Sequence, residues 1–475
     1  MKEIPSSKRK NVFSMKYLLL LILASVMLVA CKTNSANNQE DEGEVVKFEP
    51  TFECTNGLAD AKYPCDNIDL LSIVSPQELE GLENVENTSV RLNDIWGWTD
   101  SQTGKEYALV GLTNGVSFVD VSDPVNPVVI GKLPESNISA KYKVLSDPNY
   151  EACMVGIGDT EESKSLTQGS TWRDHKVFND HLFIGSDAQP HGIQVFDLSK
   201  LRSYSGTYLE FTQDALYSGL ANSHNVVINE ETGFAYATGA TNGTVCETGG
   251  LHIIDINDPK NPTFAGCYED TAPPRRRPNS AYIHDAQCVV YNGPDSDHTG
   301  SEVCFSSAEK SLVIADVTDK DSTKTLGFAT DPNMSYSHQG WLTEDQAYFL
   351  MNDELDEYNL GRTTKTYIFD VRDLDNPVFV NFYEHNTESI DHNLYIKEDY
   401  VYASNYISGL RILKMNDIGS ADLSLAGFFD SEPDTYANPN TEFEGTWSNY
   451  PYFESGIIIM SDINRGLFIL QPDLD

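Results

Sequence analysis

Basic charge is scarce in this sequence. Its 475 residues include 32 Lys and Arg against 72 Asp and Glu, so the formal net charge at pH 7 is −40. A surface of this sign repels phosphate backbones, and we therefore expect no nucleic-acid partner. The same surface suits solubility in salt and loose association with divalent cations.

Familiar catalytic motifs are also missing. The sequence has no Gly-x-Ser-x-Gly elbow, no His-Glu-x-x-His zinc motif and no phosphate-binding glycine loop, so catalytic residues stay unknown. It has no Cys-x-x-Cys pair, which argues against a thiol-redox centre or a structural zinc site. No stretch between the predicted strands sustains helical periodicity, which argues against βαβ units.

The N-terminal segment has the pattern of an export signal. A basic stretch precedes an apolar run at 17–30 that is too short to span a bilayer comfortably. The Leu-Val-Ala-Cys tetrad at 28–31 resembles the bacterial lipobox, in which the cysteine is acylated after cleavage. We therefore expect a lipoprotein signal peptide at 1–30, lipid attachment at Cys31 and an acidic flexible tether over 31–50.

This lipid makes the membrane a partner. Lys32 follows the acylated cysteine where a retention signal for the inner membrane has Asp, so we expect an exported lipoprotein of the outer membrane. Its domain faces either the periplasm or the cell exterior.

Export permits disulfides, and seven cysteines follow Cys31. Two lie in a predicted loop at 51–68 ahead of the main domain, two bracket one predicted strand pair, and two fall on neighbouring predicted strands. These candidates are, in that order, Cys54 and Cys65, Cys246 and Cys267, and Cys288 and Cys304. Cys153 is left over, and the sequence alone does not determine the connectivity.

Internal repetition predicts the fold. The phrase Gly-Val-Ser-Phe-Val-Asp-Val-Ser-Asp-Pro-Val-Asn-Pro at 115–127 returns, with changes, at 250–262. Weaker copies lie at 191–198, 311–317, 366–371, 409–415 and 466–470. Each of the seven copies has strand length, and further short strands flank it, giving four strands per unit. We therefore predict an all-β chain folded as a seven-bladed β-propeller over 69–475.

Closure of the ring follows from the count of strands. The seventh unit ends near residue 472 after its third strand, and the apolar segment 70–74 is free to supply the fourth. A strand from the N-terminus then closes the ring and leaves no unpaired strand edge. A long insertion at about 139–170 separates the first two units, as either a binding loop or decoration.

These phrases also carry a family resemblance. The Gly-Leu-x-Ile-x-Asp-x-x-Asp-Pro pattern is similar to the LVIVD repeat, and residues 70–472 resemble the choice-of-anchor B family of bacterial surface proteins. The matching phrases are Ser-His-Asn at 223–225, His-Asp-Ala-Gln at 284–287, His-Gln-Gly-Trp at 338–341, Asp-His-Asn at 391–393 and Trp-Ser-Asn-Tyr-Pro at 447–451. The resemblance implies an extracellular propeller module that different members attach by different anchors, without an established activity. The absence of a C-terminal sorting tail fits attachment through Cys31.

A polar pair begins the first strand of every unit. The pairs are Asn93-Asp94, Arg173-Asp174, His224-Asn225, His284-Asp285, His338-Gln339, His392-Asn393 and Trp447-Ser448. First strands line the channel of a propeller, so this register predicts four histidines around one rim of the channel. Three interpretations compete for these residues.

In the first, each polar pair hydrogen-bonds the connection between blades and satisfies strand-end backbone N–H and C=O groups, a role that suits the second members best. In the second, His224, His284, His338 and His392 are ligands for zinc, copper or iron, with adjacent carboxylates and amides orienting the rings. In the third, Arg173, Trp96 and Trp447 grip a glycan or a small anion without any metal.

Two acidic loops are weaker candidates. Residues 295–302 space oxygen ligands like a calcium loop, although a solvated hairpin turn is the simpler interpretation. Residues 352–357 form an acidic loop after a strand, which we expect to face solvent.

The sequence thus favours an envelope-displayed module that binds a glycan, a small molecule or an envelope protein at the histidine rim. The alternative is a metal-dependent oxidoreductase or hydrolase that uses the four histidines. A purely architectural surface protein is the third possibility.

Overall fold

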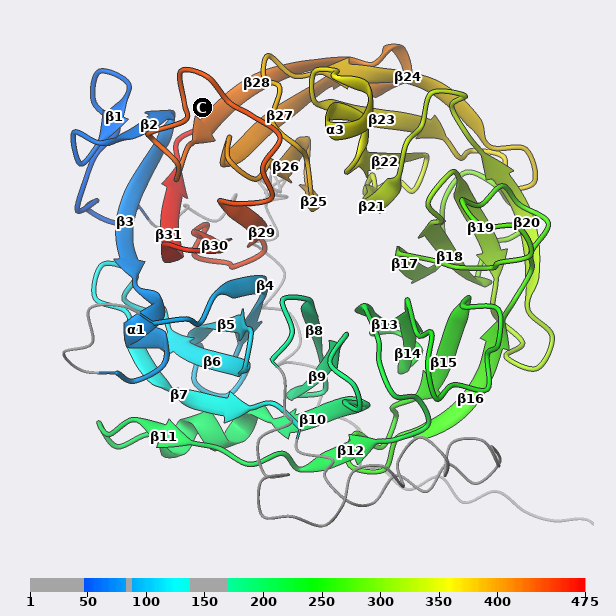
Figure 1. The fold of residues 1–475 in the computed structure, drawn as a ribbon, viewed down its shortest axis with the longest axis horizontal. Helices are drawn as coiled ribbons and strands as arrows, with labels where there is room; N and C mark the ends of the chain where they lie inside the picture. The colour runs from blue at the N-terminus through cyan, green and yellow to red at the C-terminus, as the bar shows by residue number, and fades with distance from the viewer. Residues whose placement is uncertain (1–46, 83–87, 137–168, 475) are drawn as a thin grey trace, which may run out of the picture. The chain divides into compact units, whose positions relative to one another are not determined.

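The computed structural model describes residues 47–82, 88–136 and 169–474. Within the unit Val45–Asp475, seven antiparallel sheets surround a common centre (Figure 1). This arrangement is a seven-bladed β-propeller and confirms the predicted fold class. The first strand of each blade lies innermost, because consecutive first strands contact one another around the centre.

Each blade places its strands in order from the centre outward. Blade one contains β4 (Leu92–Thr99), β5 (Glu106–Leu112), β6 (Gly115–Asp120) and β7 (Val128–Pro134). Blade two contains β8 (Arg173–Phe178), β9 (His181–Ser186), β10 (Ile193–Asp197) and β12 (Ala215–Tyr217). Blade three contains β13 (Asn225–Asn229), β14 (Phe234–Thr238), β15 (Leu251–Asp255) and β16 (Thr263–Tyr268). Blade four contains β17 (Asp285–Val290), β18 (Glu302–Ser307), β19 (Leu312–Asp316) and β20 (Lys324–Ala329).

The remaining blades follow the same order. Blade five contains β21 (Ser337–Leu342), β22 (Tyr348–Asp353), β23 (Lys365–Asp370) and β24 (Val378–Glu384). Blade six contains β25 (Leu394–Lys397), β26 (Tyr400–Ser404), β27 (Leu410–Asp417) and β28 (Asp422–Phe429). Blade seven contains β29 (Thr446–Tyr450), β30 (Ile458–Asp462), β31 (Gly466–Pro472) and, from the other end of the chain, β3 (Ile68–Val74).

Short elements decorate this frame. Strands β1 (Leu58–Ala59) and β2 (Tyr63–Asp66), from the stretch expected to precede the domain, extend the outer edge of blade six, and β11 (Leu209–Glu210) pairs with β7. The helical turns are α1 (Pro76–Leu79), η2 (Leu198–Ser203), α3 (Asp356–Leu360) and η3 (Ile418–Ser420). None of the helices in the described ranges is long and apolar enough for a membrane crossing.

The repeated phrases form third strands, which are buried on both faces between neighbouring blades. Phe118 and Val119, on opposite faces of β6, have no exposed surface, and Ile253 and Ile254, on opposite faces of β15, are at most 1% exposed. Near-continuous β-branched and aromatic residues suit such a position, because each face packs against a hydrophobic layer. The Asp-Pro turn that follows ends the strand, since proline offers no N–H to a ladder.

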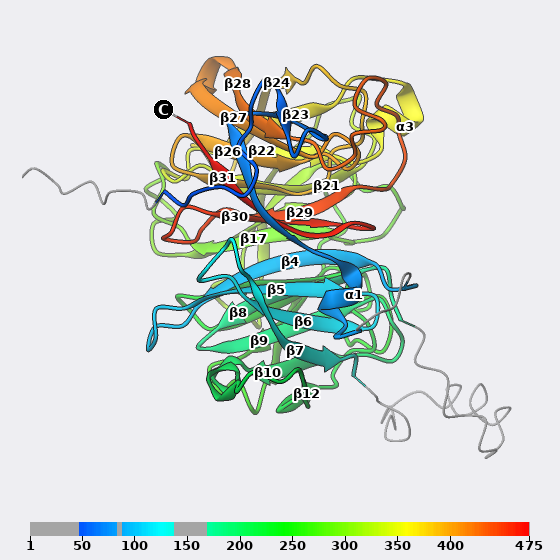
Figure 2. The ribbon, with the colours of Figure 1, turned by 90° about the vertical axis from the view of Figure 1, so that its left-hand side faces the viewer.

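The predicted closing strand is also present. Strand β3 pairs antiparallel with β31, and Leu70 lies opposite Leu470. Figure 2 views this seam from the side, with the strands of blades one and seven toward the reader. The side chain of Leu70 packs with Ile412 of blade six and Phe468 of blade seven, so one residue near the N-terminus joins two blades near the C-terminus.

All three candidate disulfides form. They link Cys54 to Cys65, Cys246 to Cys267 and Cys288 to Cys304. The predictions for the signal peptide, for Cys31, for Cys153 and for most of the insertion at 139–170 concern residues outside the described ranges.

Candidate functional site

The start of each first strand lies at one end of the channel. There the structure brings together the side chains of Asp94, Trp172, Arg173, His224, Asn225, His284, His338, His392, Asn393 and Trp447. We call this set the histidine mouth. Its hollow measures about 10 Å³, which is about the room that one water molecule or one ion needs.

The four histidines form a continuous file along blades three to six. The ring centres of His224 and His284 are 4.5 Å apart, those of His284 and His338 are 4.2 Å apart, and those of His338 and His392 are 4.4 Å apart. Trp447 continues the file at 4.7 Å from His392. The equivalent position in four successive repeats therefore places imidazole rings side by side.

Local irregularities in the first strands accompany these residues. The pairing of β21 with β22 shifts between Ser337 and Gly340, across His338 and Gln339. Similar shifts occur in β4 across Asn93 and Asp94, and in β29 across Trp447. A β-bulge redirects the side chains at its position, and here it turns polar side chains toward the channel end.

Backbone carbonyls fix the protonation of two rings. Nδ1 of His284 donates to the carbonyl oxygen of His338 at 2.9 Å, and Nδ1 of His392 donates to that of Trp447 at 2.6 Å. A carbonyl only accepts, so Nδ1 carries the hydrogen in both rings. Burial lowers the pKa of His392 to about 3 and that of His284 well below its usual range, so both rings are neutral and Nε2 keeps its lone pair.

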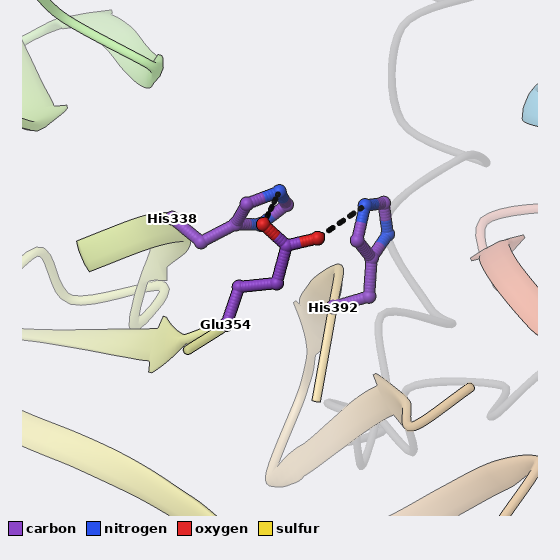
Figure 3. Close-up of side chains that lie close together, drawn as sticks. All are labelled: His338, Glu354 and His392. Carbon is purple, nitrogen blue, oxygen red and sulfur yellow. Dashed lines mark ion pairs between the residues drawn. The ribbon is translucent and has the colours of Figure 1, made fainter. Parts of the chain in front are cut away.

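A carboxylate that sequence reasoning missed lies between two of these rings. Glu354 follows β22 and directs its carboxylate between His338 and His392 (Figure 3). The distances are 3.7 Å from Oε2 to Nε2 of His338 and 4.0 Å from Oε1 to Nε2 of His392. These three residues form the one cluster in the described ranges whose potential metal-ligand atoms all lie within 4.8 Å of one another.

Tyr406 holds this carboxylate in place. Its hydroxyl donates to Oε1 of Glu354 at 2.9 Å, and its ring packs against His392. The backbone of Tyr406 has a φ of 32°, a left-handed conformation that is costly for a residue with a side chain and that clusters at functional sites. Burial raises the pKa of Glu354 to about 7, although the bond from Tyr406 opposes this rise.

His224 differs from the other three histidines. Its Nδ1 lies 2.7 Å from Oδ2 of Asp187, which follows β9. Burial favours the neutral ring, but the hydrogen bond and charge of Asp187 outweigh burial and raise the pKa of His224. His224 is thus the histidine of the mouth that most readily carries a positive charge.

The acidic loop at 352–357 was expected to face solvent, and this prediction is wrong. Asp353 and Asp356 have no exposed surface, and Glu357 is 2% exposed. The loop follows the second strand of blade five, and Asp353 lies opposite Ser337 at the start of the first strand. Because the first and second strands of a blade pair antiparallel, the second strand of each blade ends at the mouth. A search of the residues that follow the second strands would therefore have identified both Glu354 and Asp187.

The second members of several polar pairs connect neighbouring blades. Asp174 accepts a hydrogen bond from the backbone N–H of Val226, and Gln339 accepts one from that of Leu394, at 2.7 and 2.8 Å. The side-chain amide of Asn225 donates to the carbonyl oxygen of His284 at 2.9 Å. Each of these bonds joins one blade to the next.

A half-buried lysine accompanies these carboxylates. Nζ of Lys176 donates to Asp174 at 2.6 Å. Burial and the charge of Asp174 raise the pKa of Asp94 to about 8, and burial with the same neighbour raises that of Asp285 to about 7. Lys176 offsets part of this concentrated negative charge.

Two expected site residues line a separate hollow. Asp285 and Gln339 contribute, together with Lys176, to a pocket of about 260 Å³. Trp96, which we expected beside Arg173 and Trp447, also lines this pocket and is absent from the histidine mouth. Trp96 lies two residues beyond Asp94 on an inward-facing position of β4. The sequence pattern did not distinguish this position from the start of the strand, where the mouth lies.

The calcium-like loop at 295–302 has the interactions of a turn. Asp295 accepts hydrogen bonds from the backbone N–H groups of Asp297 and Leu374. These bonds occupy both carboxylate oxygens of Asp295, as in a hydrogen-bonded turn.

Comparison with known proteins agrees with the repeats. A family model for the LVIVD repeat matches residues 104–133 and 245–270, which confirms the predicted resemblance to that repeat. The matched stretches contain β6 of blade one and β15 of blade three, the strands of the two clearest phrases. No curated protein matches the chain. Together with three disulfides, the LVIVD repeats indicate an extracellular or surface protein.

Proposed function

We propose that this protein is a lipid-anchored propeller of the bacterial outer membrane, similar to choice-of-anchor B proteins, and that its histidine mouth binds a transition-metal ion. The lipobox-like tetrad ending at Cys31 and the 1–30 signal pattern support the anchor, with residues 31–50 as the tether. The module displays this site to a ligand in the envelope or outside the cell.

The observation that carries the metal site is the cluster of His338, Glu354 and His392. Metal-binding histidines characteristically donate their other ring N–H to a carbonyl or a carboxylate, as Nδ1 of His392 does. Tyr406 likewise orients the carboxylate of Glu354. The ring of His284 packs against His338 on the side away from His392 and offers a further imidazole near the cluster.

The composition of the cluster favours one class of ion. Two imidazoles and one carboxylate suit zinc, iron or copper, whereas magnesium and calcium prefer oxygen alone. The hollow of about 10 Å³ fits an ion and is far too small for a sugar ring. A glycan at the mouth is therefore less well supported than a metal.

Measuring the metal content tests this proposal. The chain from Lys32 onward, made without a histidine tag, is loaded with zinc, dialysed and analysed by inductively coupled plasma mass spectrometry. We expect about one equivalent per chain, and a loss of at least about tenfold in affinity for His338→Ala, His392→Ala and Glu354→Gln.

His181→Ala is the matched control, because His181 lies on β9 and is absent from the mouth. It should keep the metal. A wild-type protein without metal, or unchanged metal in the three mouth variants with the fold intact, contradicts the proposal.

Metal-dependent catalysis is the second candidate function. Three protein ligands leave coordination positions open, as catalytic sites require, and Arg173 lines the same mouth. A bound metal would supply Lewis acidity, and the residues that line the mouth would determine which molecules reach it. An interaction module uses the same open positions to take a ligand from its partner.

A further inference from the structure

Four buried carboxylates lie together behind the loop that carries Glu354. Asp353 ends β22, Asp356 and Glu357 begin α3, and Asp391 comes from the segment before β25. None is more than 2% exposed. We call Asp353, Asp356, Glu357 and Asp391 the carboxylate cluster.

Some of these oxygens have hydrogen-bond donors. Asp353 accepts from the backbone N–H groups of Ser335 and Tyr336, and Oδ2 of Asp356 accepts from the hydroxyl of Tyr367 at 3.0 Å. These bonds hold Asp353 and one oxygen of Asp356 in fixed positions.

Five further oxygens in the cluster have no hydrogen-bond partner of normal geometry within the described ranges, although the carboxyl groups of Asp356 and Glu357 lie against each other. They are Oδ1 of Asp356, both carboxylate oxygens of Glu357 and both of Asp391. A buried polar group without a partner is rare and costly, and three such groups in one place call for a missing ligand.

Cationic side chains do not supply that ligand. The guanidinium of Arg362 reaches 4.0 Å from Asp356 at the edge of the cluster. No ion pair among the described residues involves Glu357 or Asp391. Burial, with the neighbouring charges of Asp391 and Asp356, raises the pKa of Glu357, as expected for carboxylates that face one another without compensation.

We propose that the carboxylate cluster binds a calcium ion. Its ligands would be oxygen atoms alone, from Asp356, Glu357 and Asp391, and calcium accepts six to eight oxygens in irregular arrangements. Magnesium demands a nearly ideal octahedron and retains waters, for which this buried position is poorly suited. No three of these carboxylates have oxygens within 4.8 Å of one another in the described structure, so the ion must draw the flexible side chain of Glu357 inward.

This site goes beyond the transition-metal site proposed for the mouth. The two differ in ligand chemistry, one with nitrogen and oxygen and the other with oxygen alone. They share one loop, because Glu354 points to the histidines while its neighbours in sequence form the cluster. Calcium would therefore hold in place the loop that presents Glu354.

Calcium titration tests this inference. The chain from Lys32 onward is treated with a calcium-selective chelator and its melting temperature is followed as calcium chloride is added. We expect a rise of about 2 °C or more at millimolar calcium, and less with magnesium chloride at equal concentration. Isothermal titration calorimetry should give one calcium ion per chain.

Two variants keep the shape of the side chains while removing the charges. Glu357→Gln and Asp391→Asn should each abolish the calcium response, and both should fold because they relieve repulsion between buried carboxylates. Asp297→Asn is the matched control, since Asp297 is an exposed acidic residue in the calcium-like loop. It should respond as the wild type does.

The outcomes separate the two proposed sites. His338→Ala should keep the calcium response, and Glu357→Gln should keep the transition metal. A wild-type protein without a calcium response overturns the inference, and so does a response that persists in both Glu357→Gln and Asp391→Asn. If the wild type shows no calcium response and Asp391→Asn melts at a higher temperature than the wild type, bound protons and not a calcium ion neutralise the carboxylate cluster.

Discussion

Asp462 illustrates how single buried carboxylates affect this protein. It ends β30 and has no exposed surface. Its Oδ1 accepts hydrogen bonds from the backbone N–H groups of Asn464 and Arg465 at 3.0 and 2.8 Å, whereas Oδ2 has no partner of normal hydrogen-bond geometry in the described structure. Burial and the charge of Glu432 raise the pKa of Asp462 to about 6.

This pKa makes the stability depend on pH. Between about pH 4 and pH 6 the unfolded chain has lost the proton of Asp462 while the folded chain keeps it, so stability falls as the pH rises. A rise from the ordinary value of 3.8 to about 6 corresponds to about 3 kcal/mol at most. Asp462→Asn should abolish this contribution, because the amide keeps the acceptor and carries no charge.

The measurement is urea unfolding of both proteins at pH 4.5 and pH 7.5. The free energy of unfolding of the wild type should decrease relative to Asp462→Asn between these values. Asp422→Asn, at an exposed position, provides the reference. A constant difference between wild type and Asp462→Asn across the range would contradict the assigned protonation.

At the scale of elements, antiparallel pairing explains how the mouth is assembled. First strands begin there and second strands end there, so each blade contributes two chain segments to the same place. In blade five these segments bring His338 and Glu354 together, and in blade six they bring His392 and Tyr406. The site therefore depends on hairpins as much as on the repeat itself.

The closing strand β3 is the element that couples the two ends of the chain. Leu70 is fully buried, and Leu70→Ala should lower the free energy of unfolding by about 2–5 kcal/mol, because it removes buried methyl groups and leaves a cavity. Chemical denaturation measures this change. Leu425→Ala, at a position 45% exposed on blade six, should change stability by only about 0.5 kcal/mol. Equal effects at both positions would show that β3 contributes little to closure.

At the scale of the whole molecule, ring closure predicts an all-or-none requirement for the N-terminal strand. A chain that begins at Ser75 lacks β3 and leaves the edge of β31 unpaired, whereas a chain that begins at Val45 retains it. We expect the shorter chain to aggregate or lose cooperative unfolding, because an exposed strand edge pairs with other chains. Size-exclusion chromatography and thermal unfolding followed by circular dichroism compare the two. A monomeric, cooperatively folding short chain would contradict this.

Much of the fold was predictable because its information is local. Strand propensity, Asp-Pro turns and recurring phrases are properties of a few neighbouring residues, and seven copies leave little choice of architecture. The alignment of first strands likewise placed four histidines at equivalent positions, since repeats impose equivalent geometry. The cysteine candidates followed from export and from neighbouring strands, and the three pairs formed.

Other features were beyond the reach of local patterns. Acidic residues are abundant in this chain, so residue type alone did not distinguish Glu354 or Asp391 from carboxylates on the surface. Trp96 was misplaced because position along a strand decides which end of the channel a side chain reaches.

The sequence by itself determined seven four-stranded blades, the closing strand and the register of the histidines, because hydrophobic periodicity and repetition act along the chain. Only the tertiary structure decided which carboxylates are buried, because burial depends on segments from other blades. The same packing brings Glu354 between two histidines and encloses Asp391 with Glu357. Electrostatic interactions of these carboxylates are stronger there than at the surface, because little water is present to screen them.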